Sequence, residues 1–178
     1  METAAIETTQ PDFTAIKAKQ NSAWASGDYS LIGTTLQIVG EELAEAMDVR
    51  PGQKILDVAA GNGNFTLAAA RRWADITSSD YVPALLERGK ERADADRLEV
   101  AYETADAEEL PFNEASFDAV GSTFGVMFTP NQEKAAADQD QVESVRSKPA
   151  EDTPQSPAAP APSPLSTQQP SSLINIIA

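Results

Sequence analysis

The sequence predicts an α/β domain built on a parallel β-sheet, and two observations support that prediction. Between residues 54 and 124, short apolar segments that favour strands alternate with longer segments that favour helices. All nine glycines and every aromatic residue lie at or before Phe128, whereas seven of the twelve prolines lie between Pro149 and Pro170. We therefore expect a folded part with an apolar core, followed by a low-complexity tail.

The first well-defined element is an amphipathic helix expected within residues 34–49. Its apolar side chains recur three and four positions apart, at Leu36, Val39, Leu43 and Met47. Thr34 or Thr35 is expected to cap its start, and Pro51-Gly52 to form the turn that ends it. Residues 12–30 are mixed in character, with Trp24 and Tyr29 on either side of the SGD tripeptide.

Strands and helices then alternate along the chain. Apolar runs predict strands at 54–59, 76–80 and 116–124, and the alternation of Leu98, Val100 and Tyr102 predicts another between the last two. Helices are expected at 64–74, which is rich in alanine, and at 82–95, where Pro83 suits a first helical turn. Right-handed connections of this kind give a parallel sheet, which binds ligands beyond the carboxyl ends of its strands.

Composition excludes several kinds of chemistry. The chain has no cysteine and no histidine, so disulfides, histidine bases and the usual zinc sites are not expected. Its net charge of −15 disfavours nucleic acid as a partner. The N-terminus lacks the pattern of a signal peptide, and no apolar run reaches membrane-spanning length. We therefore expect a cytoplasmic protein without a membrane span or a bound metal.

The segment DVAAGNGN, residues 57–64, follows the first predicted strand and allows two interpretations. A dinucleotide fingerprint needs a third glycine, but Thr66 stands at that position, and the lysine of a P-loop is also absent. A nucleoside with a cationic amino group fits better, because Asp57 precedes the turn while Gly61 and Gly63 let a ligand approach the backbone. A purely structural turn between strand and helix remains the alternative.

Two further acids follow the next two strands. Asp80 ends the second strand, at the position from which a carboxylate accepts both ribose hydroxyls. It could equally cap the following helix, and one residue can do both. Asp106 follows the third strand and could accept from an exocyclic amine, or be a solvated loop acid. Three carboxylates at three adjacent strand ends suggest S-adenosylmethionine as the ligand.

These residues resemble the class I S-adenosylmethionine-dependent methyltransferases, on the branch that includes the ubiquinone/menaquinone C-methyltransferases. The resemblance covers roughly residues 20–133 and depends on three segments in order: ILDVAAGNG, SSDYVPALLERGKERA and ETADAEELPFNEASFDAV. It implies a Rossmann-like, doubly wound sheet. It also implies that S-adenosyl-L-methionine is the cofactor and that a small molecule accepts the methyl group.

The resemblance also assigns roles to individual residues. It places Asp57, Gly61 and Gly63 at the methionine end, Asp80 at the ribose, and Tyr81, Asp106 and Ala107 at the adenine. It brings Ser122 and Thr123 to the sulfonium side, and it puts Ala59 in the turn, where the family usually has glycine. An alanine there tolerates most backbone angles except a positive φ, so we expect at most weakened binding.

The family's sheet has seven strands, and the sequence predicts only about four. NQEKAAA begins the next helix of the family but gives way to ADQDQVESVRS, and nothing after Phe128 is typical of a strand. We therefore expect an N-terminal segment and helix at 1–34, a partial S-adenosylmethionine-binding domain at 35–130 and a disordered proline-rich tail at 131–178. An exposed sheet edge at the missing fifth strand would favour self-association.

Three functions remain open at this level. The first is a small-molecule methyltransferase for a quinone-like or other lipophilic acceptor, with no catalytic base that the sequence identifies. The second is a truncated remnant that binds cofactor weakly or not at all. The third is an interaction protein that acts through the tail, where P-x-x-P occurs at Pro154–Pro157 and Pro157–Pro160. Glu108 and Glu109 are expected in a solvated turn, and Trp24 and Tyr29 either pack or close over the cofactor.

Overall fold

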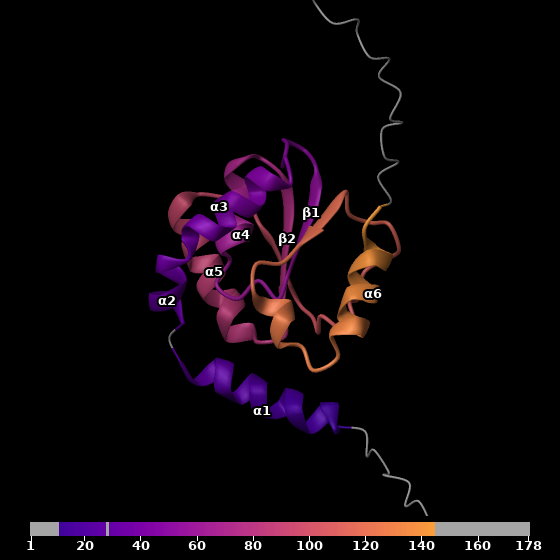
Figure 1. Cartoon of the computed structure of the whole chain (residues 1–178). Helices are drawn as coiled ribbons and strands as arrows, with labels where there is room; N and C mark the ends of the chain where they lie inside the picture. The colour runs from indigo at the N-terminus through magenta and orange to yellow at the C-terminus, as the bar shows by residue number, and fades with distance from the viewer. Residues whose placement is uncertain (1–10, 28, 145–178) are drawn as a thin grey trace, which may run out of the picture. The chain divides into compact units, whose positions relative to one another are not determined.

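A computed structural model describes residues 11–27 and 29–144, and within them four parallel strands form one sheet (Figure 1). The strands are β1 (Lys54–Val58), β2 (Asp75–Asp80), β3 (Ala101–Thr104) and β4 (Ala119–Gly121). Their spatial order is β3-β2-β1-β4, and each neighbouring pair is parallel. The α/β class and the sheet of four parallel strands are confirmed, so the carboxyl ends of all four strands lie at the same end of the sheet.

Six α-helices and one 3₁₀ helix accompany the sheet in the described residues. They are α1 (Phe13–Ser26), α2 (Ser30–Thr35), α3 (Gln37–Ala46), α4 (Asn64–Arg71), α5 (Pro83–Asp96), the 3₁₀ helix η1 (Gly125–Phe128) and α6 (Gln132–Val142). The helix expected within 34–49 thus begins at Gln37, after a separate short helix. Thr34 and Thr35 lie inside α2, so neither caps α3, which starts after Leu36 without a side-chain cap. That part of the prediction is wrong because the helical turn continues upstream of the two threonines.

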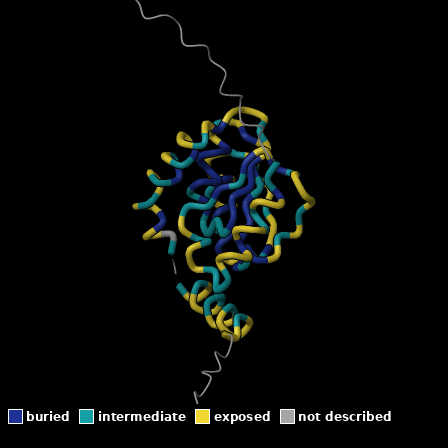
Figure 2. Tube along the Cα trace, turned by 45° about the vertical axis from the view of Figure 1, so that its right-hand side comes forward, coloured by how far each residue is buried: buried dark blue, intermediate teal, exposed yellow. Residues whose placement is uncertain are grey.

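Two apolar clusters hold helices against the two faces of the sheet. On one face Ile55 and Ile76 pack with Ala44 of α3 and Phe65 of α4. On the other, Leu56 and Val58 pack with the α6 side chains Ala135 and Val142. Successive residues of β1 therefore point to opposite faces, as the period of a strand requires. Figure 2 shows the buried residues concentrated in the centre of the domain; β1 and β2 are largely buried, whereas β3 is mostly exposed.

Helices α3 and α4 approach each other closely at Gly40. A side chain at that position would place its Cβ 2.5 Å from the carbonyl carbon of Asn64, which begins α4. The two helices can pack at this distance only because residue 40 has no side chain. This packing fixes the start of α4, and with it the loop that joins β1 to α4.

Helix α6 corrects the expectation of disorder from residue 131. Its predicted start is confirmed, but the helix continues to Val142. Ala135 and Val142 are buried, with exposures of 1% and 2%, and hold it against the sheet. Beyond it, Ser144 N–H donates to the carbonyl of Phe117 at 2.7 Å, so the chain begins to pair beside β4. Within the described residues, the folded part therefore continues past residue 130 to Ser144. The rest of the predicted tail lies outside the described residues.

None of the helices in the described ranges is long and apolar enough to cross a membrane. Helix α1 lies within residues 1–34, and none of its side chains is buried. It lies at the end of the sheet where the strands have their carboxyl ends (Figure 1). Its polar contacts to the rest of the domain bring it to the edge of the candidate site.

Candidate functional site

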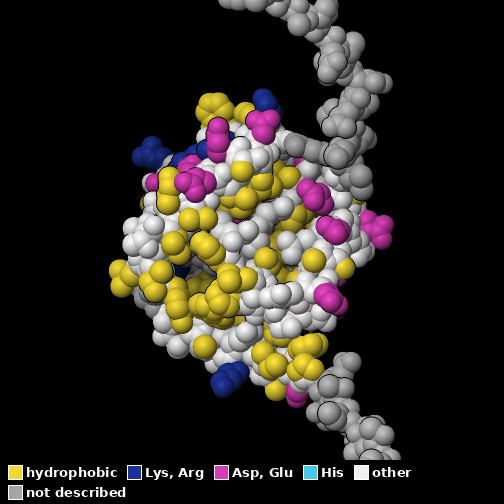
Figure 3. Space-filling view, in the orientation of Figure 1, with side chains coloured by type: hydrophobic (Ala, Val, Ile, Leu, Met, Phe, Trp, Pro, Cys, Tyr) yellow, Lys and Arg dark blue, Asp and Glu magenta, His cyan; other side chains and the backbone are white. Residues whose placement is uncertain are grey.

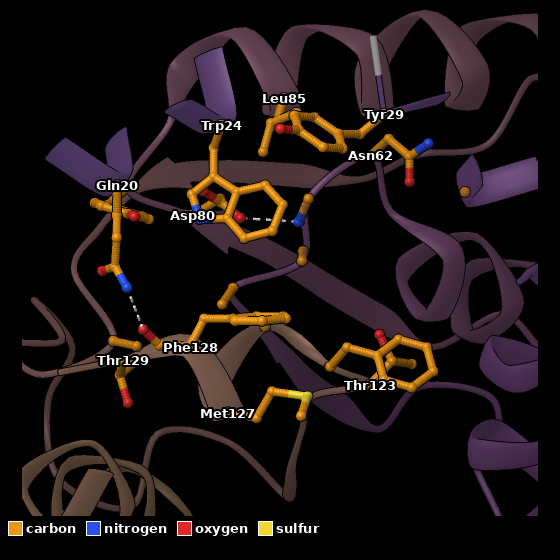
Figure 4. A pocket seen from close by; sticks show the side chains of 18 of the residues that line it. Gln20, Trp24, Tyr29, Asn62, Asp80, Leu85, Thr123, Met127, Phe128 and Thr129 are labelled. Carbon is orange, nitrogen blue, oxygen red and sulfur yellow. Dashed lines mark hydrogen bonds between the residues drawn. The ribbon is translucent and has the colours of Figure 1, made fainter. Parts of the chain in front are cut away.

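A cavity of about 440 Å³ opens beyond the carboxyl ends of the strands, between the β1–α4 loop, α1 and η1 (Figure 4). Seven of the ten residues predicted for the site line it: Ala59, Gly61, Asp80, Tyr81, Asp106, Ala107 and Thr123. Asp57, Gly63 and Ser122 are not part of its wall. Within the described residues, no group of three acidic side chains is placed to hold a metal ion.

The two glycines of the β1–α4 loop have different roles. Gly61 has φ +57°, and a Cβ built on it would have no atom within 4 Å, so this backbone faces open space. Gly63 has φ +83°, but a Cβ there would lie 3.3 Å from Cβ of Thr66. Gly61 therefore exposes the backbone to a ligand, whereas Gly63 lets the chain turn into α4.

Ala59 departs from expectation, because it adopts the positive φ that an alanine tolerates poorly, at +52°. Its methyl and carbonyl groups fit against Gly125, where a Cβ would lie 2.3 Å from Cβ and 2.2 Å from the oxygen of Ala59. The crowding that the alanine brings is thus accommodated by a glycine of η1. The left-handed conformation of a non-glycine residue costs on the order of 1–2 kcal/mol.

Asp57 lies outside the cavity wall and is 1% exposed. Its Oδ2 accepts from the N–H of Thr66 at 2.9 Å and from the Thr66 hydroxyl at 2.6 Å, while its Oδ1 has no donor in the structure. Burial raises the pKa of Asp57 to about 7, the Thr66 hydrogen bonds oppose that rise, and the charge of Asp80 adds to it. In this structure Asp57 therefore fastens the first turn of α4, which is the structural role left open by the sequence.

Asp80 connects the second strand to both the loop and the following helix. Its Oδ2 accepts from Gly61 N–H at 2.9 Å (Figure 4), and its Oδ1 accepts from Val82 N–H at 2.9 Å. The side chain lines the cavity although the residue is only 4% exposed. Burial raises the pKa of Asp80, and the backbone hydrogen bonds counteract part of this effect. Asp80 thus fixes the chain just before α5 and lines the cavity, but it does not cap α5, whose N-cap residue is Val82 and which has no side-chain cap.

Asp106 is held by local and distant partners. Its Oδ1 accepts from Glu108 N–H at 2.9 Å, and its Oδ2 lies 2.6 Å from Nζ of Lys17 in α1. Glu108 was expected in a solvated turn, but it is 3% exposed, because its Oε2 also pairs with Lys17 at 2.6 Å. Glu109 is exposed, as expected.

An apolar wall faces the loop across the cavity. The ring of Trp24 lies 4.9 Å from that of Tyr29 and 5.2 Å from that of Phe128, measured between centroids, and Met127 lies beside them (Figure 4). Trp24 and Tyr29 therefore both pack and line the cavity. Figure 3 shows hydrophobic side chains gathered around a hollow on one face of the domain. Sequence reasoning missed Phe128 and Met127, although both follow the fourth strand, where loops of such sheets carry ligand contacts.

The loop after β4 explains the place of Ser122 and Thr123. Ser122 Oγ accepts from Val126 N–H at 3.4 Å and so supports the start of η1, whereas Thr123 reaches the cavity. A glycine loop after β1, an acid at the end of β2 and a cavity over the strand ends define an α/β domain suited to a nucleoside ligand.

The chain belongs to the methyltransferase domain family, which matches residues 55–146. It is 40% identical over 84 residues to a demethylmenaquinone methyltransferase of Deinococcus radiodurans, covering 46% of this chain and 34% of that protein. The resemblance to class I S-adenosylmethionine-dependent methyltransferases of the quinone-methylating branch is thereby confirmed.

Other relatives extend the match over more of the chain. An uncharacterized protein of Mycobacterium tuberculosis (strain H37Rv) is 46% identical over 114 residues, which are 64% of this chain and 42% of that protein. A second one from the same strain is 40% identical over 132 residues, which are 74% of this chain and 48% of the relative. The chain thus spans less than half the length of these relatives.

Solved structures share the fold at lower identity. A SAM-dependent methyltransferase from Aquifex aeolicus superposes with a TM-score of 0.56 at 16% identity, over 76% of this chain and 69% of that one. The cyclase SpnF superposes with a TM-score of 0.57 at 22% identity, over 61% and 41% of the two chains. Because a methyltransferase and a cyclase share this fold, the fold by itself does not determine the reaction.

Proposed function

We propose that this chain binds S-adenosylmethionine in the cavity and transfers its methyl group to a small, largely apolar acceptor. The observation that carries the proposal is the Asp80 carboxylate, which ends β2, lines the cavity and fixes the Gly61 N–H of the glycine loop at 2.9 Å. Family membership supports methyl transfer as the class of reaction.

The residues present fit this cofactor. Gly61 offers backbone with open space beside it, and Asp80 and Asp106 offer carboxylate oxygens that could accept from ribose hydroxyls and from an adenine amine. The cavity, at about 440 Å³, lies within the range of sites for small organic ligands. Asp57 would act indirectly, because it holds the turn from which Gly61 projects rather than a ligand group.

Bound S-adenosylmethionine supplies a methyl group on a positively charged sulfur. An acceptor nucleophile can attack the methyl carbon in line, with the sulfur as the leaving group. The chain's own part is to position the two reactants and to exclude water, which together account for much of the rate in such a displacement. Trp24 and Phe128 shield the cavity with their rings. The carboxylates in the wall already accept hydrogen bonds from the protein, and the chain contains no histidine. We therefore propose that the acceptor carries a nucleophile that needs no strong base from this domain.

The aromatic wall supports an acceptor with a flat apolar part. Trp24, Tyr29 and Phe128 present ring surfaces, which stack on planar groups, and Met127 adds a flexible apolar side chain. Similarity to a demethylmenaquinone methyltransferase makes a quinone-like acceptor the first to test. The acidic net charge of −15 gives no support to a nucleic-acid acceptor.

The test has two stages, which separate binding from turnover. Calorimetric titration of the purified chain with S-adenosylhomocysteine should show saturable binding to one site, and absence of heat at millimolar ligand would overturn the proposal. Incubation with S-adenosylmethionine carrying a labelled methyl group and a panel of reduced quinones should then yield a labelled product. Binding without labelling of any acceptor would indicate a cofactor-binding remnant instead of an enzyme.

A further inference from the structure

Helix α1 reaches the cavity through one face, and that face is held by polar contacts. Lys17, Gln20 and Trp24 all line the cavity, and their spacing of three and four residues places them on the same side of the helix. Gln20 Nε2 donates to the carbonyl of Phe128 at 2.9 Å, and Asn21 Nδ2 donates to the carbonyl of Tyr81 at 2.9 Å. Because α1 buries no side chain, its attachment depends on such contacts and on the packing of Trp24 against Phe128, and not on the buried core.

Lys17 makes the charged contact in this set. Its ammonium group lies 2.6 Å from Oδ2 of Asp106 and 2.6 Å from Oε2 of Glu108, and its side chain is 24% exposed. The other oxygen of Glu108 accepts from the N–H of Asn131, the residue that caps α6. One lysine thus links α1 to the end of β3 and, through Glu108, to the start of α6.

Glu108 makes the contact with Lys17 energetically important. With its side chain only 4% exposed, the carboxylate has lost most of its hydration and depends on Lys17 for a compensating charge. Asp106 differs, because its side chain is 35% exposed and faces the cavity. The lysine can therefore remain with Glu108 while Asp106 keeps free lone pairs for a ligand.

We propose that Lys17 is a positioning residue that couples the seating of α1 over the cavity to recognition of a ligand's adenine group at Asp106. The coupling to ligand depends on the proposed function, because Asp106 is expected to meet the adenine of S-adenosylmethionine. The seating of α1 does not depend on it. Lys17 fixes the orientation of the Asp106 carboxylate and brings Trp24 and Gln20 to the wall of the same cavity.

The first experiment measures the seating of α1 in the absence of ligand. Hydrogen–deuterium exchange is followed for the amides of α1 in the wild-type chain, in Lys17→Met and in Lys19→Met, which removes an exposed lysine from the same helix. Exchange in α1 should accelerate about tenfold in Lys17→Met and stay unchanged in Lys19→Met. Equal exchange in all three proteins would overturn the proposal.

The second experiment measures ligand recognition with S-adenosylhomocysteine as the probe. Its Kd should rise about five- to tenfold in Lys17→Met, and Lys17→Arg should restore most of the affinity, because arginine keeps the charge beside both carboxylates. An unchanged Kd in Lys17→Met would contradict the coupling. If the wild-type chain itself binds no S-adenosylhomocysteine, the proposed function fails, whereas the exchange result still decides the seating of α1.

A third variant covers the case in which Lys17→Met unfolds because Glu108 is left buried and unpaired. Lys17→Met/Glu108→Gln removes both charges, so the domain should fold while α1 exchanges about tenfold faster than in the wild-type chain. Slow exchange in this double variant, at the rate of the wild-type chain, would show that the charged link does not hold α1.

Discussion

Asp57 makes the stability of this domain depend on pH in a direction opposite to that of an ordinary paired carboxylate. Burial raises its pKa from 3.8 to about 7. Because the folded protein then binds more protons than the unfolded chain between these two values, the stability that Asp57 contributes is fully present below pH 4 and is lost as the pH rises through 7. The difference of about 3 between the two pKa values corresponds to roughly 4 kcal/mol in all, of which about 3 kcal/mol falls between pH 5 and pH 8.

The variant Asp57→Asn should remove this dependence. Its amide oxygen can still accept from Thr66, while its amide nitrogen takes the place of Oδ1, which has no donor in the structure. Urea unfolding at a series of pH values should therefore show the variant gaining about 3 kcal/mol relative to the wild-type chain between pH 5 and pH 8. Asp75→Asn, at the exposed start of β2, controls for the loss of one negative charge. A difference between Asp57→Asn and the wild-type chain that stays constant with pH would refute the reasoning.

Three further substitutions test the packing that shapes the site. Ala59→Gly relieves the positive φ of the loop and should raise the free energy of unfolding by about 1 kcal/mol; an equal or lower Tm in a thermal melt would contradict this. Gly40→Ala would place a Cβ 2.5 Å from Asn64 and should lower stability by about 2–3 kcal/mol in urea unfolding, unless α3 can shift without loss. Val142→Ala should cost about 2 kcal/mol and the exposed Gln141→Ala almost nothing, whereas equal effects would mean that α6 is no part of the core.

The sequence was sufficient for the central part of the fold. Apolar runs beside turn residues identified β1 and β2 closely, since both strands are buried and short. The ends of the third and fourth strands were less well predicted, and β4 has only the residues Ala119–Gly121 of the expected 116–124. Edge strands carry fewer apolar neighbours, so their sequence pattern indicates their length poorly.

Features that depend on distant partners could not be predicted. The seating of α1 is one of them, because Lys17 and Asn21 attach the helix through polar groups whose partners lie far along the chain. The burial of Glu108 follows from the same lysine, so a solvated turn was the reasonable expectation. For Asp57, sequence position alone could not distinguish a carboxylate that faces a ligand from one that faces Thr66.

The folded part was predicted to end at residue 130, before α6, for a related reason. ADQDQV is polar, yet one apolar residue at each end of the helix, Ala135 and Val142, is enough to seat α6 on the sheet. The alternation of apolar residues was too sparse to reveal this. The candidate site was less affected, because Gly61 lies just after β1 and Asp80 at the end of β2, and the pattern located both strands closely.

The central claim is that the Asp80 carboxylate organises a site for an S-adenosyl ligand, and one comparison tests it most directly. In Asp80→Asn an amide N–H₂ must face either Gly61 N–H or Val82 N–H, so one backbone hydrogen bond is lost together with an acceptor for the ligand. Calorimetric titration with S-adenosylhomocysteine should show a Kd about a hundredfold higher for Asp80→Asn than for the wild-type chain, and an unchanged Kd for Asp75→Asn at the other end of the same strand. Equal affinity in all three proteins, or no binding to the wild-type chain, would contradict the account.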